Sequence, residues 1–182
     1  MALHGYVNTT KITAWDVDAY NLAGVYLTAD IDNGSFVTLK NINKVTGGTT
    51  ADNINGYEYV VEPATKNSAH VWLVATPEVG TDIEQQLMAD PRLFYNKKGK
   101  PMSLKFMNPY VDCIEVTPEC FSDGQLPTST NKYITLDANG KLKATNTDPS
   151  SSTGAYFTFE GYHNTTFGMK EEKCAVIRCV RN

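Results

Sequence analysis

The sequence predicts a mostly β protein: a sandwich or partly open barrel of short antiparallel strands, with one short helix near residues 82–90. Three observations favour this fold. The chain holds 10 Tyr and 7 Phe beside many Val and Thr, residue types that suit pleated, half-buried strands. Asn-Gly at 33–34 and at 139–140 is flanked by apolar runs, which indicates hairpin turns of type I′ with positive φ at both central residues. Little of the chain outside 82–90 has helical periodicity.

The first half opens with a weakly patterned segment. Residues 1–29 interleave aromatic and aliphatic side chains with Asn, Thr and Asp, which predicts an extended arm or a pair of irregular strands. After a turn at 30–34, strands are expected at 35–39 and 57–61. Residues 70–75 are mostly apolar, which is typical of a strand buried on both faces.

The helix prediction near residues 82–90 depends on its two ends. Asp82 is a suitable N-cap, and Gln85 three residues later completes an arrangement like a capping box. Pro91 would end the helix, since a residue before proline avoids helical angles. Two or three helical turns are therefore expected.

The second half is predicted to consist of strands and turns. Further strands are expected over residues 103–107, 112–117, 155–160 and 174–180. The second Asn-Gly turn lies in a hairpin over 133–145, and a connection over 164–173 joins the last two strands.

The turn at 97–101 divides the chain into two expected units. Residues 1–97 form an N-terminal β unit with an extended arm, and residues 98–182 form a C-terminal β unit. One compact domain over 1–182 is the alternative, because a chain of 182 residues is long enough to bury a single core.

Composition argues against two classes of partner. A formal charge of −4 argues against a protein that binds a phosphate backbone, which would carry a basic stripe, so no nucleic-acid partner is expected. No apolar run approaches the length of a membrane span, so no membrane partner is expected either. The first residues lack the regions of a signal peptide, which predicts a chain made and kept in a cytoplasm.

The four cysteines are expected to be thiols packed in a β core. Cys113 and Cys120 are seven residues apart, and Cys174 and Cys179 are five apart, so neither pair has the Cys-x-x-Cys spacing of a zinc knuckle. A disulfide from Cys113 or Cys120 to the last strand is the alternative.

Motifs for catalysis or cofactors are not found in the sequence. His4, His70 and His163 lie far apart, and His70 is expected to have a structural role at the start of a buried strand. A calcium loop starting at Asp30 would need glycine at its sixth position and glutamate at its twelfth; glycine is fifth and Asn41 is twelfth. We therefore expect no enzyme, no metal and no cofactor.

The aromatic residues of the first segment are the candidate interface. Tyr6, Trp15 and Tyr20 are predicted to contact a partner, since Tyr and Trp supply large contact areas at low entropy cost. Together with Tyr26 they could also form a platform for a sugar, or be part of the core or of a subunit interface.

Turns and strands follow one another in a particular order over about half of the chain, in two blocks. The segments that form this pattern are Ala29–Leu39, Leu126–Pro127, Lys132–Leu136, Gly140–Ala144, Ala155–Gly161 and Ala175–Arg178. The pattern resembles that of small bacteriophage virion proteins, namely capsid decoration (cement) proteins and the capsid-binding base of head fibres.

This resemblance implies a non-enzymatic structural protein. It would bind the major capsid protein and decorate or stabilise the capsid surface of a virion assembled in the host cytoplasm, as a homo-oligomer. The first alternative is a receptor- or carbohydrate-binding module of a phage tail, baseplate or fibre. A small enzyme with a Cys/His site formed only in space is the second.

Overall fold

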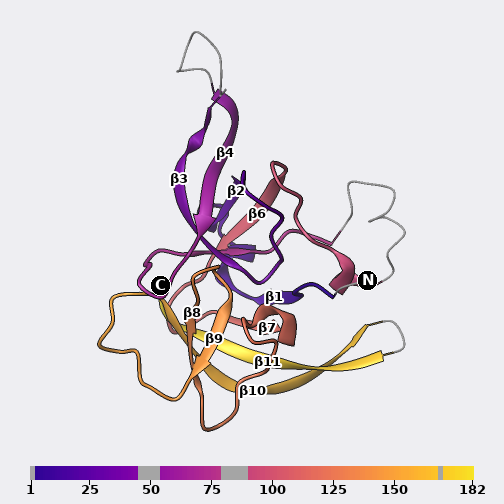
Figure 1. Ribbon diagram of the computed structural model, residues 1–182, viewed down its shortest axis with the longest axis vertical. Helices are drawn as coiled ribbons and strands as arrows, with labels where there is room; N and C mark the ends of the chain where they lie inside the picture. Colours follow the sequence, from indigo (N-terminus) through magenta and orange to yellow (C-terminus); the bar gives the residue numbers. More distant parts are fainter. Residues whose placement is uncertain (1–2, 45–53, 79–89, 168–169) are drawn as a thin grey trace.

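The predicted mostly β fold is confirmed, and it consists of a closed barrel beside an open sheet. The computed structural model describes residues 3–44, 54–78, 90–167 and 170–182 (Figure 1). Around the barrel, the five strands are β2 (Asn21–Val25), β4 (Ile54–Pro63), β3 (Phe36–Lys44), β5 (Trp72–Val74) and β6 (Pro101–Phe106). All neighbouring strands are antiparallel except β2 and β4.

The open sheet has six antiparallel strands and takes one of them from the start of the chain. In order across the sheet they are β1 (Val7–Lys11), β7 (Cys113–Val116), β11 (Lys170–Arg181), β10 (Tyr156–Phe167), β8 (Tyr133–Leu136) and β9 (Leu142–Thr145). The first residues therefore form the edge strand β1, paired with β7 so that Val7 lies opposite Val116. Two strands cross the expected boundary between the units 1–97 and 98–182. Strand β1, from the N-terminal unit, pairs in the open sheet, and strand β6, from the C-terminal unit, pairs in the barrel.

Short 3-10 helices are the helical elements of the described residues. They are η1 (Thr13–Trp15), η2 (Asp18–Tyr20), η3 (Pro91–Leu93) and η4 (Pro118–Cys120). The helix expected near 82–90 falls almost wholly on residues 79–89, outside the described part of the chain.

The larger hydrophobic core lies between the barrel and the open sheet. Phe36 of β3 and Phe157 of β10 are both fully buried, and their ring centroids are 4.8 Å apart. Burying each such side chain stabilises the fold by about 1.5–3 kcal/mol. A smaller core fills the barrel, and β5 serves both: Leu73 packs in the first and Val74 in the second. The prediction of a strand buried on both faces is thus confirmed for β5.

The Asn-Gly turns at 33–34 and 139–140 differ from each other and from the prediction. The second joins β8 to β9, as expected, but the first does not join paired strands, because β4 lies between β2 and β3. Gly34 and Gly140 have positive φ, whereas Asn33 and Asn139 do not, so the predicted type I′ geometry is wrong for both. Asn33 is buried, and its side-chain oxygen accepts hydrogen bonds from the Thr76 and Asn96 nitrogens.

The two turns meet at the junction of the barrel and the sheet. The Phe36 N–H donates a 2.8 Å hydrogen bond to the Gly140 carbonyl. Beside it, the Lys141 ammonium lies 3.2 Å from the Asp32 carboxylate, whose other oxygen is 2.7 Å from a ring nitrogen of His4. The motifs therefore hold the two sheets together across about a hundred residues of sequence.

The last two strands are longer than predicted. β10 and β11 pair from Tyr156↔Arg181 to Phe167↔Lys170, so the connection expected over 164–173 is mostly strand. Figure 1 shows this ribbon running out beyond the rest of the sheet. Side chains there are mostly exposed, so the sequence lacks the apolar alternation that marks a strand with one buried face.

Candidate binding surface

The structure places the three predicted interface residues in different surroundings. Trp15 is 59% exposed at the end of η1. Tyr6 is half-buried, with its ring edge-on to Phe167, and burial raises the pKa of its hydroxyl. Tyr20 is half-buried beside the larger core, 5.7 Å from the Phe106 ring. Trp15 is therefore the predicted residue that presents most surface to a partner.

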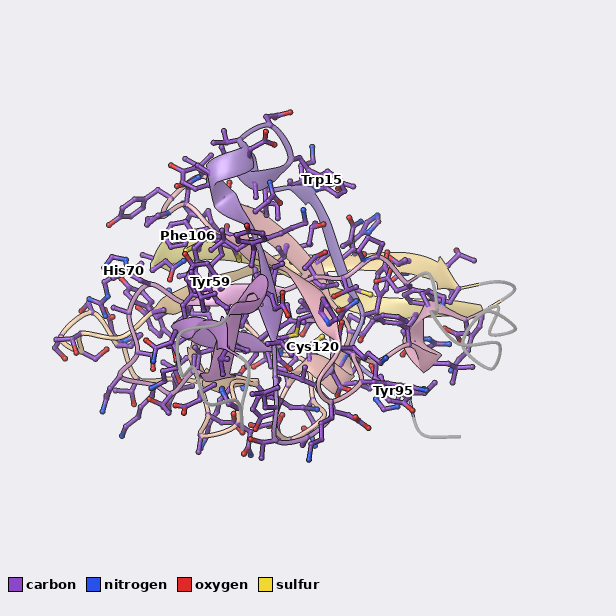
Figure 2. The ribbon with its side chains drawn as sticks, turned by 90° about the horizontal axis from the view of Figure 1, so that it is seen from above. Trp15, Tyr59, His70, Tyr95, Phe106 and Cys120 are labelled. Carbon is purple, nitrogen blue, oxygen red and sulfur yellow. The ribbon has the colours of Figure 1, made fainter. Side chains whose placement is uncertain are left out.

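Trp15 lines a cleft of about 270 Å³ where the two sheets meet. Figure 2 shows Trp15 at the edge of the molecule, apart from Tyr59 and His70. The cleft is lined by β1, η1, β6 and the segment after β5, through Val7, Thr9, Trp15, Ala75, Thr76, Pro77, Glu78, Ser103 and Lys105. An exposed indole beside hydroxyl, ammonium and carboxyl groups is typical of a small ligand site.

The indole of Trp15 is fixed in place from two directions. Its Nε1–H donates a hydrogen bond to the Thr9 carbonyl of β1. The ammonium of Lys105 lies 4.2 Å from the ring centroid, a cation–π contact, and donates a 2.9 Å bond to Asn21. Burial lowers the pKa of the Lys105 ammonium. The ring is therefore presented in one orientation, which reduces the entropy lost on binding.

Glu78 supplies the carboxyl group of the cleft. Burial raises the pKa of this carboxyl, while a 3.2 Å hydrogen bond from the Asn33 amide opposes the shift. Asn33 also donates to the Thr76 carbonyl, and the Thr76 hydroxyl accepts from the Ser103 N–H. The first Asn-Gly motif thus helps to build the wall of the cleft.

Replacing Glu78 with glutamine should flatten part of the pH dependence of stability. With a raised pKa the native state binds more protons than the unfolded state, so wild-type stability falls as pH rises from the ordinary value of 4.5 through the raised value. The glutamine side chain keeps the acceptor for Asn33 and does not ionise. The free energy of unfolding, measured by urea titration from pH 4 to 7, should therefore favour Glu78→Gln increasingly toward pH 7. A constant difference would contradict this prediction.

The turn before β7 is a second exposed apolar feature, and no sequence pattern described above predicts it. Tyr110 and Val111 are 70% and 69% exposed, and Tyr110 has φ of 66°, a left-handed conformation that is rare for an aromatic residue. The next residue, Asp112, is buried and holds the turn: it accepts hydrogen bonds from the N–H and hydroxyl of Thr13 and from the Asn108 N–H. Since Thr13 belongs to η1, this turn and the helix that carries Trp15 are tied together.

The variant Tyr110→Gly tests the backbone strain of the left-handed conformation at Tyr110. Because glycine adopts positive φ without penalty, Tyr110→Gly should leave stability unchanged or raise it by about 1 kcal/mol. Urea unfolding followed by Trp fluorescence measures this. A clear loss of stability would show that the tyrosine ring is needed for folding and is not simply displayed by the turn.

The four cysteines, all within the described part of the chain, are free thiols. This agrees with the expectation of reduced cysteines and excludes the alternative of a bridge in this structure. Burial raises the pKa of Cys120 and Cys179 to about 12 and that of Cys174 to about 11. Thiols in such surroundings are inert, because the thiolate is the nucleophile.

A disulfide reagent that reports thiols by absorbance should therefore find the native protein almost unreactive at pH 8. The half-buried Cys113 should react first and slowly, since burial also raises its pKa, and all four thiols should react in denaturant. The time course of absorbance measures both states. Rapid reaction of two or more native thiols would contradict the packing described.

Three further features bear on other chemistry in the described residues: the place of His70, groups that could hold a metal ion, and helices that could cross a membrane. His70 is exposed with φ of 53°, so its expected role in a buried strand is wrong. The described part of the chain has no group of three or more His, Cys, Asp and Glu side chains arranged to hold a metal ion. Within these same ranges, no helix has the length and apolarity needed to cross a membrane.

The comparisons with known proteins assign no role to this surface. No family model, no curated protein and no solved structure matches this chain. The cleft at Trp15 and the turn at Tyr110–Val111, linked by the bonds between Thr13 and Asp112, form the candidate binding surface.

Proposed function

We propose that the protein is a non-enzymatic structural component of a bacteriophage virion that binds the major capsid protein and decorates or stabilises the capsid as a homo-oligomer. The sequence resemblance to decoration and head-fibre base proteins supports this proposal. Its segments fall in both sheets: 29–39 holds the first Asn-Gly turn and the start of β3, 126–127 precedes β8, and the other segments lie on or beside β8 to β11.

The observation that carries the proposal is the candidate binding surface. Three exposed apolar side chains, Trp15, Tyr110 and Val111, stand on segments fixed by a buried carboxylate. Aromatic anchors on a rigid body favour tight association, because little conformational entropy is lost when they are buried. Binding to a capsid protein through such anchors needs no reacting group.

Copy number in purified particles tests the proposal most directly. We expect many copies in each virion, released by mild denaturant before the capsid itself breaks. Quantitative mass spectrometry of the particles, with the major capsid protein as the internal standard, measures this. A handful of copies would place the protein in the tail instead, and its absence from particles would overturn the proposal.

Substitutions at the surface then test which residues bind. Deleting residues 1–15 is not a clean test, because Val7, Ile12 and Ala14 are part of the core. The double variant Trp15→Ala and Tyr110→Gly should instead lose most capsid occupancy in a reconstitution with undecorated particles. Tyr57→Ala is the matched control, since Tyr57 is an 88% exposed aromatic on β4. If the double variant occupies the capsid as fully as Tyr57→Ala does, the partner binds elsewhere.

A further inference from the structure

We infer that the cleft at Trp15 is a binding site for a neutral carbohydrate, sized for about one pyranose ring. This inference does not rest on capsid binding: both place a ligand at Trp15, so a capsid bound there would cover the cleft, and the sugar is tested on the free protein. It rests on the aromatic surface of the cleft, on its hydroxyl groups, on the balance of its charges and on its size.

The aromatic surface is suited to a sugar ring. The indole of Trp15 is 59% exposed although its nitrogen is bonded to Thr9 and its ring contacts Lys105. A pyranose presents a face of C–H groups, which are weakly positive and apolar, to the negative face of an aromatic ring. A fixed indole can therefore hold such a ring without rearrangement.

The polar lining can both donate and accept hydrogen bonds. Among the described residues, the structure gives no hydrogen-bond partner to the hydroxyls of Thr9 and Ser103, both of which line the cleft. Hydroxyl groups serve as donor and acceptor, as do those of a sugar. Lys105 adds donors beyond the bond that it makes to Asn21, and Glu78 adds an acceptor.

The charges and the volume narrow the ligand class. Lys105 and Glu78 bring one potential cation and one potential anion to the same cleft, so the site does not select a strongly charged ligand such as a phosphate. Its 270 Å³ lies just below the range of sites for drug-sized molecules, which leaves room for one ring and its hydroxyls. Neutral hexoses and N-acetylhexosamines meet these conditions.

NMR titration of the whole protein tests the inference with an internal control. The chain has two tryptophans, and Trp72 is half-buried between the barrel strands, so the two indole N–H signals report on the cleft and on the core separately. The probes are methyl glucoside, methyl galactoside, methyl mannoside and N-acetylglucosamine, each added up to about 50 mM, a range that detects weak single-ring binding. At least one should shift the Trp15 signal saturably and leave the Trp72 signal in place.

Variants then assign the binding to the cleft. Trp15→Ala should weaken binding roughly ten-fold or more, followed through the backbone signals of Ser103 and Thr76. Ser103→Ala removes one hydroxyl with little effect on folding and should weaken binding about five-fold. Tyr57→Ala, the exposed aromatic on β4, should bind as the wild type does.

Three results would overturn the inference. They are an unmoved Trp15 signal with all four sugars, binding that survives Trp15→Ala in a folded protein, and a response to inorganic phosphate as strong as that to the sugars. Capsid occupancy is measured separately in particles, so loss of sugar binding with normal occupancy rejects this inference alone.

Discussion

Gly140→Ala is expected to destabilise the protein by about 3 kcal/mol or more. Gly140 has φ of +76°, and a Cβ atom there would lie 2.2 Å from the Phe36 carbonyl oxygen. The backbone cannot easily move away, since the Phe36 N–H is bonded to the Gly140 carbonyl and the Ala64 N–H to that of Phe36. The strain of a left-handed alanine and the overlap with fixed backbone therefore add.

Gly99→Ala separates these two contributions. Gly99 has nearly the same φ, +71°, but no atom lies within 4 Å of a Cβ atom built there. This variant should lose only about 1 kcal/mol, the penalty of the left-handed conformation. Urea unfolding of both variants, followed by circular dichroism, gives the comparison. Equal losses would mean that the two Asn-Gly turns are not in contact in solution.

Asp112→Ala is expected to be similarly damaging, at about 3 kcal/mol. The carboxylate is 1% exposed and accepts three hydrogen bonds: 2.8 and 2.5 Å from the N–H and hydroxyl of Thr13, and 2.7 Å from the Asn108 N–H. Alanine would leave these part-buried donors without their acceptor, and each such donor costs about 1 kcal/mol. The loss should appear in urea unfolding at pH 7.

Two further variants test whether the loss comes from the missing acceptor rather than from any change of an aspartate. Asp112→Asn keeps the shape but directs an amide N–H at a backbone donor, so it should recover only part of the loss. Asp123→Ala removes an exposed carboxylate that accepts one bond from the Gln125 N–H, and should change stability by less than about 0.5 kcal/mol. A mild effect of Asp112→Ala would contradict the role given to this residue in holding the Tyr110 turn.

Local patterns in the sequence are enough to predict the fold class. Strand β5 is predictable because a short apolar run has no polar face, and the β8–β9 hairpin because a turn motif separates two short alternating runs. The extent of β10 and β11 is not predictable in this way. Their outer halves are held by backbone pairing and have few buried side chains, so hydrophobicity does not mark them.

The features that local sequence patterns miss share one physical cause: contacts between residues distant in sequence determine the local geometry. Asn33 lies in a turn, as predicted, but not in a type I′ hairpin, and its buried amide is held by bonds to Thr76 and Asn96. Tyr110 cannot be found from sequence, because its positive φ depends on Asp112 and on the hydrogen bond from the Tyr110 N–H to the Cys179 carbonyl. Trp15 is identified by residue type alone, whereas its cleft exists only once β1 and β6 lie together.

The position of β1 at the sheet edge has a consequence for the order of folding. The barrel strands all lie between residues 21 and 106, but β1 pairs with β7, more than a hundred residues later in the chain. Contacts of such long separation form slowly. We expect β1, although it is synthesised before the barrel strands, to be among the last to find its partner, so that the cleft between β1 and β6 forms only after β7 has been synthesised.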